Sequence, residues 1–228
     1  MDSIPPRSGK AGRDSAGPDN PESAQRTLIY IPIIHTQADM GALSGSIARL
    51  KIKKLGKKGW EHNVNQVSRL WVRIEHILDE LSLPYKRLRV YQDGLPVCGR
   101  EMEIVRELAN AGSRNHNLLL RLNDRGATIM GTESSELLVE EYQFIKEEFA
   151  SGRPEPGLQG KARRRALKDS LLKRRDQYIA RRINETLCAG ETGLLFLGML
   201  HSVRRWLDKD LRVVYPIVQA LNHGERRS

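Results

Sequence analysis

The sequence predicts an α/β fold, in which a mostly parallel sheet of about five strands is flanked by helices within one domain. Segments with the composition of strands alternate with helical segments along almost the whole chain. The length of 228 residues suits one sizeable domain. We place this domain at residues 26–222, between a tail over residues 1–25 and a frayed end over residues 223–228. Proline, glycine and serine dominate the tail, which is predicted to be disordered because it has little apolar surface to bury.

Five segments have the composition of strands. They are rich in β-branched and apolar residues, and glycine, proline or polar turn residues bound them. The first, RTLIYIPII, reads as a strand buried on both faces, and its Pro32 indicates a sheet edge or a strand end. The five predicted strand regions are 26–34, 86–96, 127–131, 192–198 and 211–217.

Helices are predicted between these strands. The clearest covers His62 to Leu81, where six apolar residues recur at alternating spacings of three and four, and Pro84 closes it. These residues are Val64, Val67, Trp71, Ile74, Leu78 and Leu81. Further helices are predicted at 100–112, 115–126, 132–150 and 162–187, with a loop or short helix at 41–59 and a loop at 151–161.

The charge is strongly positive and clustered. The net charge is +10, and residues 161–182 hold ten lysines or arginines against two aspartates. Such density can indicate a surface that contacts phosphate groups, although a solvated helix face is the commoner explanation. Residues 51–58 and 161–182 are therefore the regions through which nucleic acid would bind.

Other features limit the class of protein. The longest apolar run, Gly193 to Leu200, has eight residues, far short of the roughly 18 that a membrane-spanning helix needs. Cys98 and Cys188 are too few for a disulfide framework, so we expect free thiols and a cytoplasmic protein. A glycine-rich nucleotide loop is absent, and the oligomeric state is left open.

Histidines and acidic residues follow the predicted strands. In open parallel sheets, ligands bind outside the carboxyl ends of the strands, where loops and helix N-termini converge. Imidazoles and carboxylates gathered there would suit a divalent metal ion or general acid–base chemistry. The residues that follow the first four strands are His35, Asp39, Asp93, Glu133, Glu136 and His201.

Structural roles are the alternative for each of these residues. A histidine at a strand end is commonly just a hydrogen-bonded structural residue. Asp93 is followed by a glycine and suits a turn, and Glu136 suits the first turn of a helix, where the helix dipole favours acids. The remaining four histidines, His62, His76, His116 and His223, lie on predicted helices or in the tail and are assigned no chemistry.

The long basic helix carries a charge on its apolar stripe. Leu172, Ile179, Ile183 and Leu187 form the stripe, and Arg175 or Asp176 completes its spacing. A buried charge costs several kcal/mol unless it is paired, so this pair is predicted to reach the pocket, although either side chain could turn to solvent. Arg175 would then bind an anionic group of the substrate or orient a carboxylate such as Glu133.

The segment RRDQYIARRINETLCAGETGLLFLGMLHSV resembles the carboxyl-terminal part of the TraB, ChaN and Tiki superfamily, which includes erythromycin esterases. The likeness lies in an Arg-polar pair on a helix, followed by a strand that ends in Gly-x-x-His, here Gly198 to His201. Pro32 to His35 takes the place of the other histidine motif, without its glycine, and Glu133 with Glu136 takes the place of the acidic pair. The resemblance implies a mixed α/β fold with a His-and-Glu site, which in different relatives hydrolyses peptides with a metal ion, hydrolyses esters or binds haem.

The prediction from sequence is thus a hydrolase-like protein that acts on an ester or amide of a small molecule or peptide. One histidine, held by a carboxylate, would deprotonate the attacking water, with a divalent metal ion as an optional electrophile. The predicted catalytic residues are His35, His201, Glu133 and Arg175, the substrate-binding residues Asp39, Asp93 and Asp176, and the metal ligands His35, His201 and Glu136. The alternative is a non-catalytic protein that binds nucleic acid or another partner through its basic segments.

Overall fold

The computed structural model describes residues 25–36, 39, 44–149 and 157–217. The predicted frayed end and all but one residue of the predicted tail lie outside these ranges. Within them the chain forms a five-stranded, fully parallel sheet flanked by helices, which confirms the predicted α/β class. The strands are β1 (Thr27–Ile33), β2 (Leu88–Gln92), β3 (Thr128–Met130), β4 (Thr192–Gly198) and β5 (Arg212–Val214).

The strand order is β3-β2-β4-β1-β5, so β4 lies at the centre although it comes late in the sequence. It pairs with β1 along its whole length, from Thr27 opposite Thr192 to Ile33 opposite Gly198. Strand β5 pairs only with Thr27–Ile29 of β1. Pro32 therefore lies where β1 has β4 as its only neighbour, which explains how a residue without an N–H group fits this position.

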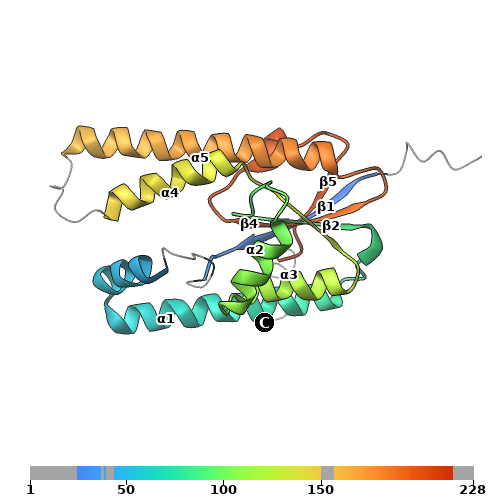
Figure 1. The fold of residues 1–228 in the computed structure, drawn as a ribbon, viewed down its shortest axis with the longest axis horizontal. Coiled ribbons are helices and arrows are strands. Elements are labelled where there is room, and N and C mark those ends of the chain that lie inside the picture. Colours follow the sequence, from blue (N-terminus) through green and yellow to red (C-terminus); the bar gives the residue numbers. More distant parts are fainter. Residues whose placement is uncertain (1–24, 37–38, 40–43, 150–156, 218–228) are drawn as a thin grey trace, which may run out of the picture.

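Helices cover both faces of the sheet (Figure 1). The helices α1 (Ser44–Glu80), α2 (Glu101–Asn110) and α3 (Arg114–Asp124) pack against one face, and α4 (Ser135–Phe149) and α5 (Leu158–Thr186) lie over the other. Two short 3-10 helices, η3 (Tyr85–Arg87) and η4 (Val203–Trp206), complete the described elements. In the described residues, none of the helices is both long enough and apolar enough to cross a membrane.

The apolar stripe predicted for the helix over 62–81 faces the sheet. Val67, Trp71, Ile74 and Leu78 are buried in the core beneath the sheet, whereas Val64 is 45% exposed near the turn where α1 bends away. Side chains alternate along β1, so that Ile29 and its neighbours on that face join the same core. The opposite face packs against α5 and η4.

Helix α1 is two helical legs joined at Gly56. Gly56 has φ of 72° and ψ of 165°, a conformation that side-chain-bearing residues rarely adopt, and the chain changes direction there (Figure 1). The region predicted as a loop or short helix is therefore helical wherever the structure describes it. Helix α5 begins at Leu158, four residues before the predicted start. Residues 158–161, which were predicted to be the end of a loop, are therefore helical.

The two edges of the sheet differ in what lies beyond them. Helices α1, α4 and α5 all extend past the carboxyl edge (Figure 1). At the amino edge the strands begin next to exposed or partly exposed ion pairs. Arg26 Nη2 lies 2.7 Å from Asp210 and 3.0 Å from Asp208, and Arg89 pairs with Glu191, which precedes β4.

Candidate functional site

A pocket of about 460 Å³ lies at the carboxyl edge of the sheet. Its polar side chains come from the segments that follow β1, β2 and β4 and from α3, α4 and α5. They are His35, Asp39, Asp93, His116, Glu141, Arg175 and His201. The rest of its wall is mainly apolar and consists of Ile33, Ile34, Leu108, Leu138, Ile145, Leu172, Met199 and Leu200. The pocket can therefore hold a molecule that is largely apolar with a polar group at one point.

Asp93 is the centre of the polar cluster. Its Oδ2 accepts a hydrogen bond from the backbone N–H of Gly198 at 2.9 Å and lies 2.9 Å from Nε2 of His35. Nε2 of His201 lies 3.7 Å from the same oxygen, and Oδ1 accepts from Arg175 at 3.0 Å. The two imidazoles that the sequence placed after β1 and β4 thus meet at one carboxylate oxygen, supplied by β2.

Gly198 allows the end of β4 to approach this carboxylate. A Cβ atom at this position would lie 2.9 Å from Oδ2 of Asp93, closer than real Cβ atoms come to their neighbours. The backbone N–H at this position also donates to that oxygen. The glycine of the Gly-x-x-His segment is therefore required by a close contact between strand end and carboxylate.

Arg175 holds three carboxylates together. It donates to Glu133 from Nε and Nη2 at 2.7 and 2.6 Å, and to Glu141 from Nη1 at 2.6 Å, in addition to its contact with Asp93. Its side chain is 6% exposed. These bonds occupy four of the five guanidinium N–H groups, so Arg175 orients carboxylates, the second of the two roles that the sequence suggested. Binding of an anionic group of the substrate stays a prediction.

Glu133 lies behind the pocket and not on its wall. It is fully buried, receives both bonds of the Arg175 fork and accepts from the backbone N–H of Gly94 at 2.9 Å. Burial raises its pKa and the nearby Asp93 raises it further, while Arg175 opposes the shift. Glu133, a predicted catalytic residue, thus binds the arginine that also binds Asp93, and it does not line the pocket.

Asp176 holds His201 in place. Its Oδ1 lies 2.7 Å from Nδ1 of His201, and its Oδ2 accepts from the backbone N–H of Ser202 at 2.9 Å. Asp176 is buried and, like Glu133, does not line the pocket. Of the Arg175–Asp176 pair, which was predicted to reach the pocket, only Arg175 lines it, and Asp176 contacts His201 where a substrate contact was predicted.

The protonation of the cluster follows from its contacts. Burial disfavours the Asp93 carboxylate, but the hydrogen bond with His35 and the charges of His201 and Arg175 outweigh it and lower the pKa. Burial works against protonation of both histidines. The bond to Asp93 nevertheless raises the pKa of His35, and the bond to Asp176 raises the pKa of His201. Asp93 is thus an ionised carboxylate between two imidazoles whose pKa values are both raised.

Glu136 is separate from this cluster. It is exposed in the first turn of α4, where its carboxylate accepts a hydrogen bond from the Ser134 hydroxyl at 2.5 Å, and it does not line the pocket. This is the helix-end role that the sequence left open.

Among the described residues, no group of three or more histidine, cysteine, aspartate or glutamate side chains is arranged to hold a metal ion. The predicted metal ion stays a prediction, with only His35 and His201 of its three ligands brought together.

Two residues of the pocket wall had no role in the sequence analysis. Glu141 follows Glu136 on α4 and reaches Arg175, and His116 lies at the start of α3 with its ring against the pocket. The segment Ser113-Arg-Asn-His116 has a serine three residues before the histidine, the spacing of a helix cap that bonds a side chain in its first turn. That spacing indicates the local hydrogen bond, but only the tertiary fold brings the ring to the pocket.

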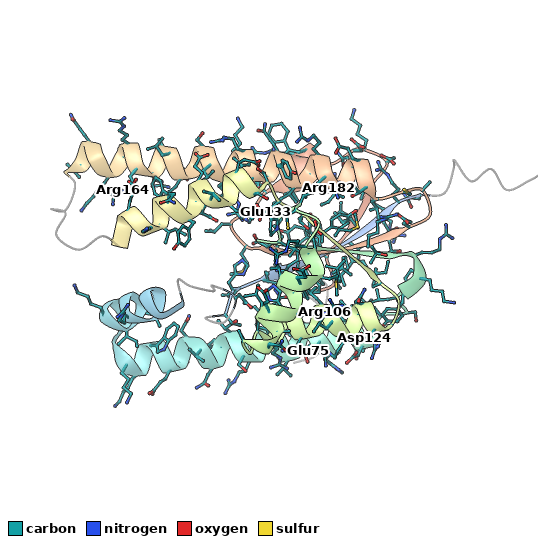
Figure 2. The ribbon with its side chains drawn as sticks, viewed as in Figure 1. Glu75, Arg106, Asp124, Glu133, Arg164 and Arg182 are labelled. Carbon is teal, nitrogen blue, oxygen red and sulfur yellow. The ribbon has the colours of Figure 1, made fainter. Side chains whose placement is uncertain are left out.

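Figure 2 shows Glu133 at the centre of the molecule and Arg164 on the part of α5 that extends beyond the sheet. The cluster therefore lies deep, whereas the dense positive charge lies farther out along the same helix.

No protein-family model matches the chain, and neither a curated protein nor a solved structure is significantly similar to it.

Proposed function

We propose that the chain is a hydrolase that cleaves an ester or amide of an amphiphilic small molecule or peptide in the pocket at the carboxyl edge. One observation carries this proposal: His35 and His201 approach the same oxygen of Asp93, and Asp176 holds His201 from the other side. Two imidazoles fixed by buried carboxylates, at one end of a largely apolar pocket, are equipped to move protons at a carbonyl group.

His201 is the proposed general base. Its Nδ1 donates to Asp176, so in the neutral ring, which forms above the raised pKa of His201, Nε2 carries the lone pair that accepts a proton from a water molecule. The water oxygen forms the new bond to the carbonyl carbon as its proton passes to Nε2. Asp176 then stabilises the imidazolium, in the way that a carboxylate orients the histidine of a hydrolytic triad.

His35 is the proposed proton donor. Its Nε2 donates to Asp93, and this bond raises the pKa of His35 against the effect of burial, which favours the protonated ring. Nδ1 of that ring can then donate to the carbonyl oxygen as it gains negative charge, or protonate the leaving group as the bond to it breaks. Arg175 and Glu133 position Asp93 between the two rings and do not themselves contact the substrate. A divalent metal ion bound by His35 and His201 would supply an electrophile at the same carbonyl.

The test is hydrolysis of p-nitrophenyl esters and anilides of straight-chain acids by the purified protein, with and without EDTA and added Zn²⁺. His201→Asn keeps an N–H donor for Asp176 but has no atom at the position of Nε2. We expect it to lower kcat by roughly 10²- to 10⁴-fold, the usual contribution of a positioned acid or base. His76→Asn is the matched control, because that histidine is exposed on α1 and far from the pocket lining. Absence of hydrolysis across the panel, or equal rates in His201→Asn and the wild type, would contradict the proposal.

Nucleic-acid binding through residues 51–58 and 161–182 is the second candidate. Lys53, Lys57 and Lys58 are exposed on the first leg of α1 and at its bend. On the other side of the pocket, however, the acidic helix α4 packs along α5, and Glu140 and Glu141 pair with Arg174 and Arg175. Part of the positive charge of α5 is thus matched within the fold. Binding to duplex DNA that weakens steeply with salt would support this function, and retention on heparin that does not depend on salt would oppose it.

A further inference from the structure

A second polar cluster lies on the pocket wall contributed by α3. Ser113 caps α3, accepting from the backbone N–H of His116 at 3.2 Å, and its hydroxyl donates to Oδ1 of Asp39. Nδ1 of His116 lies 2.6 Å from that hydroxyl oxygen. Asp39 is held in turn by the backbone N–H of Thr36 at 2.6 Å, next to His35. All three side chains of the cluster, Asp39, Ser113 and His116, are almost fully buried.

The hydrogen bonds determine where the protons lie. Burial disfavours the Asp39 carboxylate, but hydrogen bonds from His116, Ser113 and Thr36 outweigh it and lower its pKa. The ionised carboxylate only accepts, so the single hydroxyl proton of Ser113 points to it. The serine oxygen must then accept from Nδ1 of His116, which fixes the proton of the neutral imidazole on Nδ1. Nε2 of the neutral ring is therefore a hydrogen-bond acceptor.

The same contacts make a nucleophilic role for Ser113 untenable. In a Ser-His-Asp triad, the serine and the carboxylate bind opposite nitrogens of the imidazole. Here both approach Nδ1, since Oδ1 of Asp39 lies 3.6 Å from it. The hydroxyl is also fully buried and already makes three hydrogen bonds. The cluster fixes the orientation of the His116 ring and does not prepare a nucleophile.

The free edge of this ring belongs to the pocket. His116 and Asp39 line it together with His35, Asp93 and His201. Within the described part of the chain, Nε2 of His116 makes no hydrogen bond, whereas Nδ1 is engaged. Asp39 accepts from the backbone N–H of Thr36, the residue after His35, so this acceptor and the Asp93 cluster share one pocket whose remaining wall is mainly apolar. A ligand that reaches both, and also covers the apolar wall, has an apolar part and two polar groups.

We infer that Nε2 of His116 is a specificity-determining acceptor, which binds a hydrogen-bond donor carried by the apolar part of the ligand, such as a hydroxyl or an amide N–H. The inference rests on the proposed function for the identity of the reacting group, but not for the binding itself. It narrows the substrate class to amphiphiles that carry a second, uncharged hydrogen-bond donor in addition to the scissile carbonyl.

Two substitutions separate this role from that of a structural cap. His116→Asn places an amide where Nδ1 stands, so it can still donate to Ser113, but it has no atom at the position of Nε2. His116→Gln places an amide oxygen near the position of Nε2 and keeps an acceptor there. Urea unfolding of both variants reports whether the cap at α3 remains intact.

The probes are p-nitrophenyl esters of straight-chain acids and of their ω-hydroxy counterparts, over a series of chain lengths. In the wild type we expect the hydroxylated ester of one length to have a kcat/KM roughly three- to tenfold above its plain partner, as one neutral hydrogen bond allows. His116→Asn should reduce that ratio to about one, and His116→Gln should retain part of it. A ratio in His116→Asn equal to that of the wild type would overturn the inference while leaving hydrolysis intact.

A binding measurement keeps the inference testable without catalysis. In ¹⁵N-labelled protein, the nitrogen shifts of His116 report the tautomer and any hydrogen bond to Nε2. Straight-chain diols should shift Nε2 more than the matched monoalcohols do, and the proton should be found on Nδ1. If no ester is hydrolysed but the diols shift Nε2, the proposed function fails and the inference stands. A proton on Nε2, or equal shifts with diols and monoalcohols, would overturn it.

Discussion

Both edges of the sheet are held by arginine–carboxylate pairs, but they occupy different surroundings. At the amino edge, Arg26 and Arg89 pair with acids that precede β4 and β5, and these groups are exposed or half-buried. At the carboxyl edge, Arg175 and its partners Asp93 and Glu133 are almost wholly buried, with two histidines beside them. Arginine–carboxylate pairs therefore hold strand ends together at the amino edge. At the carboxyl edge, similar pairs are buried next to two histidines and a pocket.

The sharpest test of this difference is to remove the buried arginine. Arg175→Met leaves Glu133 buried without its cation and Asp93 with only the two histidines, and we expect the free energy of unfolding to fall by about 3 to 5 kcal/mol. Urea denaturation followed by circular dichroism measures the loss. Arg175→Lys, which keeps the charge but not the fork, should recover only part of it. A loss below about 1 kcal/mol, the range of exposed ion pairs, would remove the distinction between the two edges.

The two ends of β4 offer a second comparison, because each has a glycine in close contact. Gly198→Ala brings a methyl group against the Asp93 carboxylate, whereas Gly193→Ala meets the flexible end of Leu28. We expect Gly198→Ala to cost about 1 to 3 kcal/mol and to shift the NMR titrations of His35 and His201. Gly193→Ala should leave those titrations unchanged whatever its effect on stability. Identical titration curves in Gly198→Ala and the wild type would contradict the close contact.

The two edges should respond to pH in opposite directions. His35 and His201 have raised pKa values in the folded protein, so their stabilisation is complete below the unfolded pKa of about 6.5 and is lost as the pH rises through the folded pKa. Glu191 has a lowered pKa, because of its hydrogen bond with Arg89, so its stabilisation is present above about pH 4.5 and is lost as the pH falls.

Unfolding free energies of His201→Asn, Glu191→Gln and the wild type, measured across pH, check this expectation. The difference between His201→Asn and the wild type should shrink above about pH 6.5, and that between Glu191→Gln and the wild type should shrink below about pH 4.5. If both differences decline on the same side of neutrality, the assignment of the His201 proton is incorrect.

The smallest effect is expected for the pair at the amino edge. Arg89→Met breaks a half-buried bond to Glu191, and we expect a cost of about 1 kcal/mol or less because water reaches both groups. Hydrolytic activity, where it is found, should be unchanged, since neither residue lines the pocket. A loss as large as that of Arg175→Met would mean that burial does not set the energy of these pairs.

Much of the fold is predictable because its signals are local. The apolar spacing of Val67, Trp71, Ile74 and Leu78 predicts a helix with one buried face, and the parallel sheet follows from strands that alternate with helices. The order of the strands does not follow, because nothing local to residues 192–198 indicates that this segment separates β1 from β2. The bend at Gly56 does not follow either, because the sequence indicates only a loop or short helix over 41–59 and not the first leg of a longer helix.

Only those residues of the candidate site that follow from the parallel arrangement of the strands are predictable from the sequence. His35 and His201 could be paired because parallel strands bring their carboxyl ends to one edge. Asp93 was assigned to the substrate and to a turn, but its central place depends on β2 lying next to β4. The role of Asp176 as the partner of His201, and the position of His116 on the pocket wall, depend on how helices α5 and α3 cross the sheet edge. Such packing has no signature in a single sequence.

The central position of β4 has a consequence for how the chain folds. Strands β1 and β2 have no ladder with each other, and both await a segment more than 90 residues farther along the chain. Early hairpin-like nucleation is thus unavailable to the sheet, and closure of very long loops must precede most of its contacts, which is expected to make refolding slow. Because the N–H of Gly198 bonds to Asp93 when β4 joins the sheet, we expect a nascent chain to order this carboxylate cluster only after residues up to Gly198 have left the ribosome.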